Sequence, residues 1–93
     1  MIIVGKNTLE KYVKKHGDIR RAVQAWIYDV ETSTWKNPQE IKNRYSSASF
    51  LSNNKVVFNI KGNNYRLIVV VVYKMGFVNI KWIGTHAEYD KII

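Results

Sequence analysis

The chain has 93 residues, of which 46% are hydrophobic and 24% charged, so we expect a single globular domain over residues 1–93 with one modest core. Fifteen Lys and Arg stand against seven Asp and Glu, a formal net charge of +8, which predicts a polyanionic partner because cationic surface attracts phosphate and releases its counterions. The alternative is that the charge only keeps the protein in solution. There is no cysteine, which excludes disulfides, thiolate catalysis and Cys-ligated zinc and suits a reducing cytoplasm.

The first third of the chain predicts a short strand followed by two helices. Residues 1–4 are an apolar run that fits a strand. Asn7 and Glu10 fit a capping box that opens a helix, and Gly17 ends it. Asp18 is expected to cap the second helix. Apolar residues recur there at helical spacing, so one face should be buried: Ile19, Ala22, Val23, Trp26, Ile27 and Val30.

A third, short helix should begin after Asn37, because Asn37 can cap it, Pro38 occupies the first position and Glu40 the third. We expect it to fade near Arg44. The apolar period then changes to two, and polar or glycine-containing turns separate three expected strands: residues 55–61, 65–73 and 77–83. The middle strand is almost wholly apolar, so burial on both faces is expected. Residues 84–90 should leave the sheet as a short helix, which completes an α+β arrangement.

Alternation along the outer strands predicts a basic face on this sheet. Val56, Phe58 and Ile60 should share one face, and Val78, Ile80 and Trp82 should join them against the helices. Arg66 can reach the opposite surface at the end of the sheet. The remaining polar residues would gather on that surface, either as a cradle for a nucleic-acid backbone or as a solvated face: Lys55, Asn59, Lys61, Asn79 and Lys81.

The chain offers little conventional catalytic chemistry. His16 is most simply a surface residue, whereas His86 lies just past the last strand. A metal site is not expected, because no second histidine accompanies His86, Glu88 and Asp90. Metal-free cleavage of RNA needs only a proton acceptor for the 2′-hydroxyl, cations for the phosphate and a proton donor for the leaving oxygen. The N-terminus lacks a signal peptide, and the longest apolar run, residues 67–73, is far shorter than the ~20 residues of a membrane span. We expect a cytoplasmic protein that does not associate with membranes.

Five blocks of the sequence closely resemble the HigB mRNA interferases of the RelE-like superfamily. They keep the same order over nearly the whole chain: WKNPQEIK at 35–42, YSSAS at 45–49, VVFNIKGN at 56–63, YRL at 65–67 and GTHAEYD at 84–90. The resemblance implies a RelE-like fold, with an antiparallel sheet of about four strands packed against two to three helices on one face. It also implies the toxin of a type II toxin–antitoxin pair, which cuts mRNA on the translating ribosome without a cofactor. The expected partners are mRNA, the ribosome and a HigA-like helix-turn-helix antitoxin, in a higher-order toxin–antitoxin complex.

Carried over by position, the resemblance implies four catalytic residues. His86 would act as acid or base, while Lys61 and Arg66 would hold the scissile phosphate. Tyr89 would stack on a base or assist proton transfer, although it could instead pack the C-terminal segment onto the sheet. Arg66 could pair with an acid such as Asp90. Four further residues are expected to contact RNA: Arg44, Lys55, Asn59 and Lys81.

Two other functions remain open from the sequence. The protein could be a basic nucleic-acid-binding module without catalysis, such as a degenerate toxin, or an interaction domain whose basic surface meets only an acidic antitoxin. If it is a toxin, the antitoxin is expected to cover the basic face. Tyr73 and Trp82 are expected in the core rather than as platforms for stacking bases.

Overall fold

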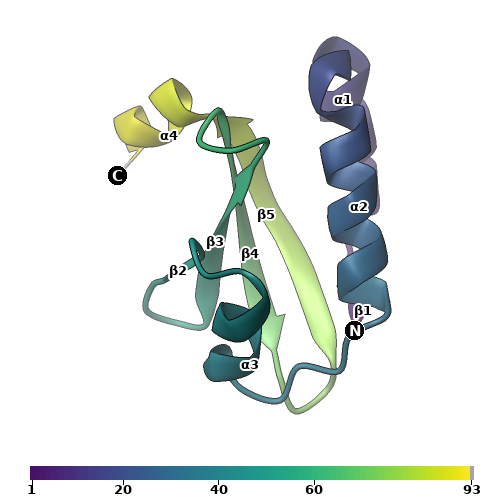
Figure 1. The fold of residues 1–93 in the computed structure, drawn as a ribbon, viewed down its shortest axis with the longest axis vertical. Helices are drawn as coiled ribbons and strands as arrows, with labels where there is room; N and C mark the ends of the chain where they lie inside the picture. The colour runs from purple at the N-terminus through teal and green to yellow at the C-terminus, as the bar shows by residue number, and fades with distance from the viewer. Residues whose placement is uncertain (93) are drawn as a thin grey trace.

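Residues 1–92 are described by a computed structural model, in which helices pack against one face of a five-stranded sheet (Figure 1). No helix in this part of the chain is long and apolar enough to cross a membrane. The elements, in chain order, are β1 Ile2–Val4, α1 Lys6–Lys15, a 3₁₀ turn Gly17–Ile19, α2 Arg20–Glu31, α3 Pro38–Arg44, β2 Ser49–Phe50, β3 Lys55–Ile60, β4 Tyr65–Val72, β5 Phe77–Thr85 and α4 His86–Ile92.

The strand order is β1-β5-β4-β3-β2. Strands β3, β4 and β5 form the antiparallel meander that the sequence predicts, and the α+β class is confirmed. We predicted about four strands, all antiparallel, and the sheet differs in both respects. Strand β1 pairs in parallel with β5, and the two-residue strand β2 adds to β3, so the sheet is mixed. A strand of two residues is too short to leave a period in the sequence.

The predicted caps of the first two helices are wrong. Helix α1 begins after Gly5, which has a φ of 94° and lies against Ile80, so Asn7 is inside the helix and caps nothing. Asp18 makes no capping hydrogen bond to α2 and instead accepts one from the hydroxyl of Tyr65. The cap of α3 is confirmed, since the Asn37 side chain accepts a 3.0 Å hydrogen bond from the backbone of Glu40.

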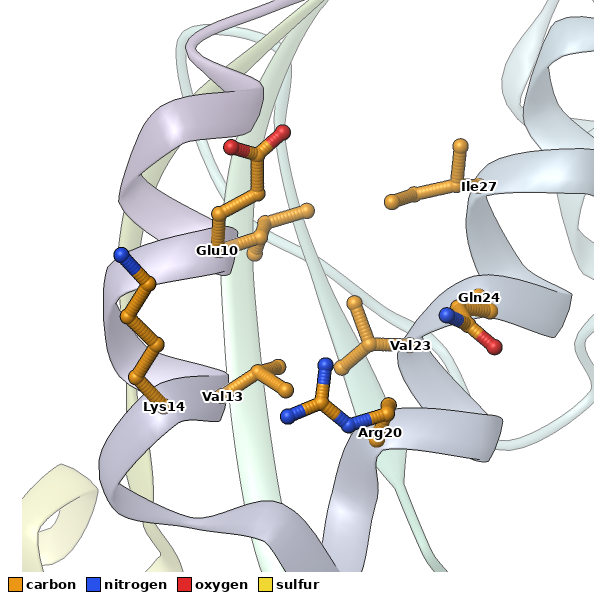
Figure 2. A pocket seen from close by; sticks show the side chains of 8 residues that line it. Glu10, Val13, Lys14, Arg20, Val23, Gln24 and Ile27 are labelled. Atoms are coloured by element: carbon orange, nitrogen blue, oxygen red, sulfur yellow. The ribbon is translucent and has the colours of Figure 1, made fainter.

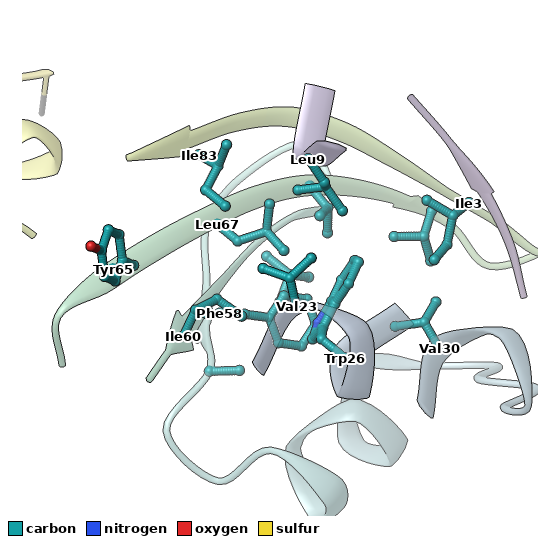
Figure 3. Packing of buried hydrophobic residues seen from close by; sticks show 14 of the residues in the cluster. Ile3, Leu9, Val23, Trp26, Val30, Phe58, Ile60, Tyr65, Leu67 and Ile83 are labelled. Carbon is teal, nitrogen blue, oxygen red and sulfur yellow. The ribbon is translucent and has the colours of Figure 1, made fainter. Parts of the chain in front are cut away.

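Helices α1, α2 and α3 cover one face of the sheet, here called the helix face, and the apolar side chains of both layers form the core (Figure 3). Trp26 of α2 meets Phe58 of β3 edge to face at 5.4 Å, and Tyr12 of α1 meets Tyr65 of β4 at 6.1 Å. Tyr45, which follows α3, also packs on Phe58. The predicted buried stripe of α2 is confirmed, because Ile19, Val23, Trp26 and Val30 are all buried.

The opposite surface of the sheet, here called the open face, differs from its prediction. Along β4, buried residues alternate with half-exposed ones, so this strand is not buried on both faces. Strand β5 contains a β-bulge, because Ile68 pairs with Trp82 while the next residue, Val69, pairs with Ile80. The extra residue, Lys81, inverts the alternation along the rest of the strand. Trp82 therefore lies on the open face.

The bulge also corrects Ile83, which alternation assigns to the open face. Ile83 pairs with Leu67 and is buried in the core. The register of the three meander strands gives the open face these residues: Lys55, Val57 and Asn59 from β3, Arg66, Ile68, Val70 and Val72 from β4, and Phe77, Asn79, Trp82 and Gly84 from β5.

Candidate active site at the end of the sheet

Arg66 and His86 meet where β5 passes into α4. Arg66 pairs in register with Gly84, and α4 begins two residues later. The chain leaves the sheet through a capping box: the hydroxyl of Thr85 accepts from the backbone of Glu88 at 3.1 Å, and Glu88 Oε1 accepts from the backbone of Thr85 at 2.7 Å. The Thr-x-x-Glu spacing was a readable signal for this helix start, and sequence analysis missed it.

The imidazole of His86 is held on several sides. Its Nδ1 lies 3.2 Å from the carbonyl oxygen of Asn63, in the turn between β3 and β4. Arg66 Nη2 lies 3.2 Å from Nδ1 and 3.4 Å from Nε2. A single nitrogen almost equally far from both ring nitrogens stands over the ring, not along either lone pair. Nε2 lies 3.4 Å from Asp90 Oδ1.

A carbonyl oxygen can only accept, so Asn63 favours a proton on Nδ1, and the Asp90 carboxylate favours one on Nε2 in the same way. Asp90 is an exposed side chain, so Nε2 lies on the more open side of the ring. The same Asn63 carbonyl also accepts from Arg66 Nη1 at 3.4 Å. One turn carbonyl thus orients both side chains.

Tyr89 completes this group of side chains. The guanidinium carbon of Arg66 lies 5.9 Å from the centre of the Tyr89 ring, within cation–π range. The Tyr89 ring also lies 6.2 Å from that of Trp82. Asp90 faces His86, and among residues 1–92 no ion pair joins Asp90 to Arg66. Three of the four predicted catalytic residues, from β4 and α4, therefore lie together.

Lys61, the fourth predicted catalytic residue, points elsewhere. It occupies the left-handed region at the end of β3, with a φ of 54°, and its ammonium lies 3.4 Å from Asp18 Oδ2 on the α1–α2 side of the sheet. The hydroxyl of Tyr65 donates to the same carboxylate at 3.0 Å. This hydrogen bond, with the nearby Lys61, holds the pKa of Asp18 below its ordinary value. Lys61 thus belongs to a contact beside the Arg66–His86 group, not within it.

His16 is not the simple surface residue that the sequence suggests. Its ring stacks on Tyr12 at 4.1 Å and meets Tyr65 edge to face at 5.8 Å. Glu88 faces this pair from α4: burial and Glu88 raise the pKa of Tyr12 to about 12. Hydrogen bonds from Thr85, with smaller effects of His16 and Tyr12, lower the pKa of Glu88. Helix α4 therefore contacts the end of the sheet through the Thr85–Glu88 capping box and through Tyr89, which packs near Trp82.

Of the predicted RNA contacts, Arg44 lies outside the open face. Its Nη2 forms a 2.6 Å ion pair with Asp29 of α2, and its guanidinium stands 5.0 Å over the ring of Tyr45. Tyr45 donates to the same Asp29 carboxylate at 2.7 Å, and burial together with this bond raises the pKa of Tyr45. Arg44 thus joins α3 to α2.

The other three predicted RNA contacts lie around an apolar surface. Lys55 and Asn59 are on the open face, and Asn59 stands opposite Arg66. Lys81 is exposed at the bulge. The centre of the open face is not basic: it consists of half-exposed or buried apolar side chains, Val57, Ile68, Val70 and Trp82. The prediction of a basic cradle is therefore wrong: the open face has an apolar floor, with Lys55, Asn59 and Arg66 at its edge.

Much of the positive charge lies on the other side of the molecule, near the corner between α1 and α2. Five exposed basic side chains gather there, and none forms an ion pair within residues 1–92: Lys11, Lys14, Lys15, Arg20 and Arg21. A groove of about 240 Å³ runs between the two helices, with an apolar floor that includes Val13 and Val23 and with Lys14 and Arg20 beside it (Figure 2). None of the predicted site residues lines this groove. In the described part of the chain, no three His, Asp or Glu side chains gather closely enough to hold a metal ion.

Comparison with known proteins identifies the family. A family model described as the RelE-like toxic component of a toxin–antitoxin system, HigB_toxin, matches residues 19–92. A curated relative from Escherichia coli O6:H1 (strain CFT073), named mRNA interferase HigB, is 27% identical over 94 aligned positions, which cover 99% of this chain and 91% of the relative. These matches confirm the resemblance drawn from the sequence blocks. The chain therefore belongs to the HigB toxin family, the RelE-like toxic component of a toxin–antitoxin system.

Proposed function

We propose that this protein is a metal-independent endoribonuclease that cleaves mRNA, with its active site at the end of the sheet. The observation that carries the proposal is the meeting of Arg66, His86 and Tyr89, which come from β4 and α4. Nδ1 of His86 faces the carbonyl of Asn63, and Nε2 faces the exposed carboxylate of Asp90. The name of the Escherichia coli relative, mRNA interferase HigB, supports the same activity.

In the proposed reaction the 2′-hydroxyl of the substrate attacks the adjacent phosphate, and the bond to the 5′-oxygen breaks. Nε2 of His86 exchanges the proton, because Nδ1 is bound to the carbonyl of Asn63. Whether His86 takes the proton from the 2′-hydroxyl or gives one to the leaving oxygen, the same nitrogen is used. Asp90 Oδ1, 3.4 Å from Nε2, would face that proton.

Arg66 supplies the positive charge that the phosphate needs in the transition state. Its guanidinium is half-buried against Tyr89 and His86, which restricts its motion and favours a fixed phosphate position. Lys61 is assigned a second, more mobile role. Its pair with Asp18 is exposed on both sides, and such pairs are worth roughly 0–1 kcal/mol, so Lys61 can swing to a bound phosphate at little cost.

We further propose that the enzyme works on the translating ribosome, with two RNA-facing surfaces. The open face would take mRNA, with Lys55, Asn59 and Lys81 at its rim. The basic corner of α1 and α2 would face ribosomal RNA, since each unpaired Lys or Arg that meets a phosphate adds to a salt-dependent attraction. A contribution of Arg44 to RNA binding would require its ion pair with Asp29 to open.

A HigA-like helix-turn-helix antitoxin is proposed to neutralise the toxin by covering the open face, within a higher-order complex. The half-exposed apolar floor of that face supports this, because burying it would stabilise a complex. Trp82 lies on this floor. Protection of Trp82 from acrylamide quenching when antitoxin binds would agree with the proposal, and unchanged quenching in a tight complex would refute it.

The function is tested by expressing wild type and His86→Gln in bacteria, following growth and mapping the 5′ ends of cellular mRNA. The chain offers a matched control, His16→Gln, which removes the other histidine and leaves the Arg66 group in place. We expect growth arrest and new 5′ ends within translated regions for wild type and His16→Gln, and neither for His86→Gln. Thermal unfolding of the purified variants checks that all three are folded.

The other outcomes are equally informative. Cleavage by His86→Gln at the wild-type rate would keep the enzyme and remove the proposed role of His86. Cleavage that continues when translation is blocked would refute the ribosome proposal. Folded wild-type protein that gives neither arrest nor new ends would favour the non-catalytic nucleic-acid-binding module.

A further inference from the structure

The bulge in β5 places a large aromatic side chain beside the proposed active site. Without the extra residue Lys81, Trp82 would point into the core, as alternation predicts. Instead it pairs with Ile68 on the open face, the face that also carries Arg66. A bulge is a recognised way of re-aiming a side chain next to a site. Its effect here is to bring an indole close to the Arg66–His86 group.

The space around Trp82 is shaped to keep the indole on the sheet surface. Its ring lies across Gly84, where a Cβ would stand 2.5 Å from Trp82 Cζ2. Any other residue at position 84 would have to displace the ring. The ring of Tyr89 is 6.2 Å from that of Trp82, and the guanidinium of Arg66 is 5.9 Å from the centre of the Tyr89 ring. Two aromatic rings and a guanidinium thus lie close together at the end of the open face.

Trp82 also differs from the other two tryptophans of the chain. Trp26 and Trp35 are 2% and 5% exposed and pack on Phe58 in the core. Trp82 is half-exposed, and its neighbours across the sheet are apolar, with no hydrogen-bond donor or acceptor on the Ile68 side chain to read a base edge. A surface of this kind suits a flat, apolar ligand face.

We propose that the indole of Trp82, beside Tyr89, is a nucleobase subsite, on which an unpaired base of the RNA next to the scissile phosphate stacks. This inference rests on the proposed function and names how that site takes its substrate. Because every base has a π-face, the subsite would accept all four bases and would require them to be single-stranded. One stacked base is worth a factor of roughly 5–150 in affinity.

The experiment measures binding without cleavage. The probe is a short single-stranded oligoadenylate with 2′-O-methyl groups, which lacks the attacking hydroxyl, and the readout is the intrinsic fluorescence of purified protein. Because Trp26 and Trp35 are buried, a saturable quench by the probe reports on Trp82. The same oligonucleotide paired with its complement should give no quench. Anisotropy of a labelled probe then gives the affinity of variants that lack Trp82.

We expect Trp82→Leu to weaken probe binding by roughly 5–150-fold and Trp82→Phe, which keeps an aromatic face, to weaken it much less. Tyr28→Leu is the matched control, since Tyr28 is 69% exposed on α2, away from the site. Near-ultraviolet circular dichroism and thermal unfolding confirm that α4 is still in place. If Trp82 only anchors α4, the wild type would bind the probe without quenching, and both Trp82 variants would bind it equally well.

The subsite and the function can fail separately. Wild-type protein that cleaves translated mRNA but shows no quench with any single-stranded probe would overturn the subsite and leave the function standing. A saturable quench that depends on Trp82, from a protein that cleaves nothing, would support the subsite and overturn the catalysis.

Discussion

Replacing Gly84 by alanine tests how closely Trp82 and Glu88 pack at the end of β5. The added Cβ would stand 2.5 Å from Trp82 Cζ2 and 2.9 Å from Glu88 Oε1, so both side chains must move. Overpacking of this kind costs about 1–3 kcal/mol, of which about 0.5–1 kcal/mol is recovered because glycine is unfavourable in a strand. Taking the middle of each range leaves a net loss of about 1.2 kcal/mol. In a chain of this size each kcal/mol lowers Tm by roughly 4–8 °C, so we expect a fall on the order of 5–10 °C.

The assay is thermal unfolding followed by circular dichroism, with Gly17→Ala as the matched control. Gly17 has no atom within 4 Å of the added Cβ and no left-handed φ, so alanine there should leave Tm unchanged or raise it slightly. The two variants make the same chemical change and differ only in their surroundings. A Gly84→Ala protein as stable as Gly17→Ala would refute the packing argument, and with it the reason given for glycine beneath the indole.

Three further changes have defined outcomes. Tyr45→Phe removes the 2.7 Å hydrogen bond to Asp29 and should lower the free energy of unfolding by about 1–2 kcal/mol; an unchanged urea midpoint would contradict this. The pKa of Asp18 is lowered mainly by the Tyr65 hydroxyl, so its stabilisation is present above the ordinary value of 3.8 and is lost as pH falls through the folded pKa. The stability difference between wild type and Asp18→Asn should therefore shrink below pH 3.8 in a series of urea titrations. Asn37→Ala removes the cap of α3 and should cost about 1 kcal/mol, whereas Asn37→Asp should keep most of it.

The parts of the fold that sequence analysis found correctly depend on local signals. The buried stripe of α2 recurs at helical spacing, and the cap of α3 needs only Asn37 and the backbone three residues on. Of the three meander strands, the outer two alternate and the middle one is an apolar, β-branched run, and all three are bounded by turns that contain glycine or asparagine. Each signal lies within one segment, so one segment is enough to read it.

Apart from the local capping box of Thr85 and Glu88, the missed features depend mostly on contacts between distant segments. The β-bulge is defined by the pairing of Trp82 with Ile68 on another strand, and the sequence of residues 77–85 alone contains no signal for it. Asp18 has the side chain of a helix cap, but Tyr65, 47 residues away, takes its carboxylate. Alternation along the strand assigns Lys61 to the open face. Its backbone is left-handed at the turn, however, and its side chain lies near Asp18. Alternation is a rule for regular strands, and it fails where a strand ends or bulges.

For the site, the sequence correctly placed Arg66, His86 and Tyr89 near one another, because the first lies at the start of β4 and the others follow the end of β5. The sequence did not predict which atoms contact each of these three side chains. The Asn63 carbonyl that orients His86 is a backbone atom and has no signature in residue type. The apolar floor of the open face was also not predicted, because the middle strand was expected to be buried on both faces and Trp82 was expected in the core.

Helix α4 is attached to the protein by its contacts at the sheet's end and has no buried side chain of its own. It is seven residues long, and Ala87, Asp90, Lys91 and Ile92 are exposed, so its unfolding gives up little apolar burial. Segments of this kind open with a free energy well below that of the whole molecule. The helix that carries His86 and Tyr89 can thus melt while the five-stranded sheet stays intact. On warming, the protein should pass through a range of temperatures in which the sheet is folded but the proposed active site is already disordered.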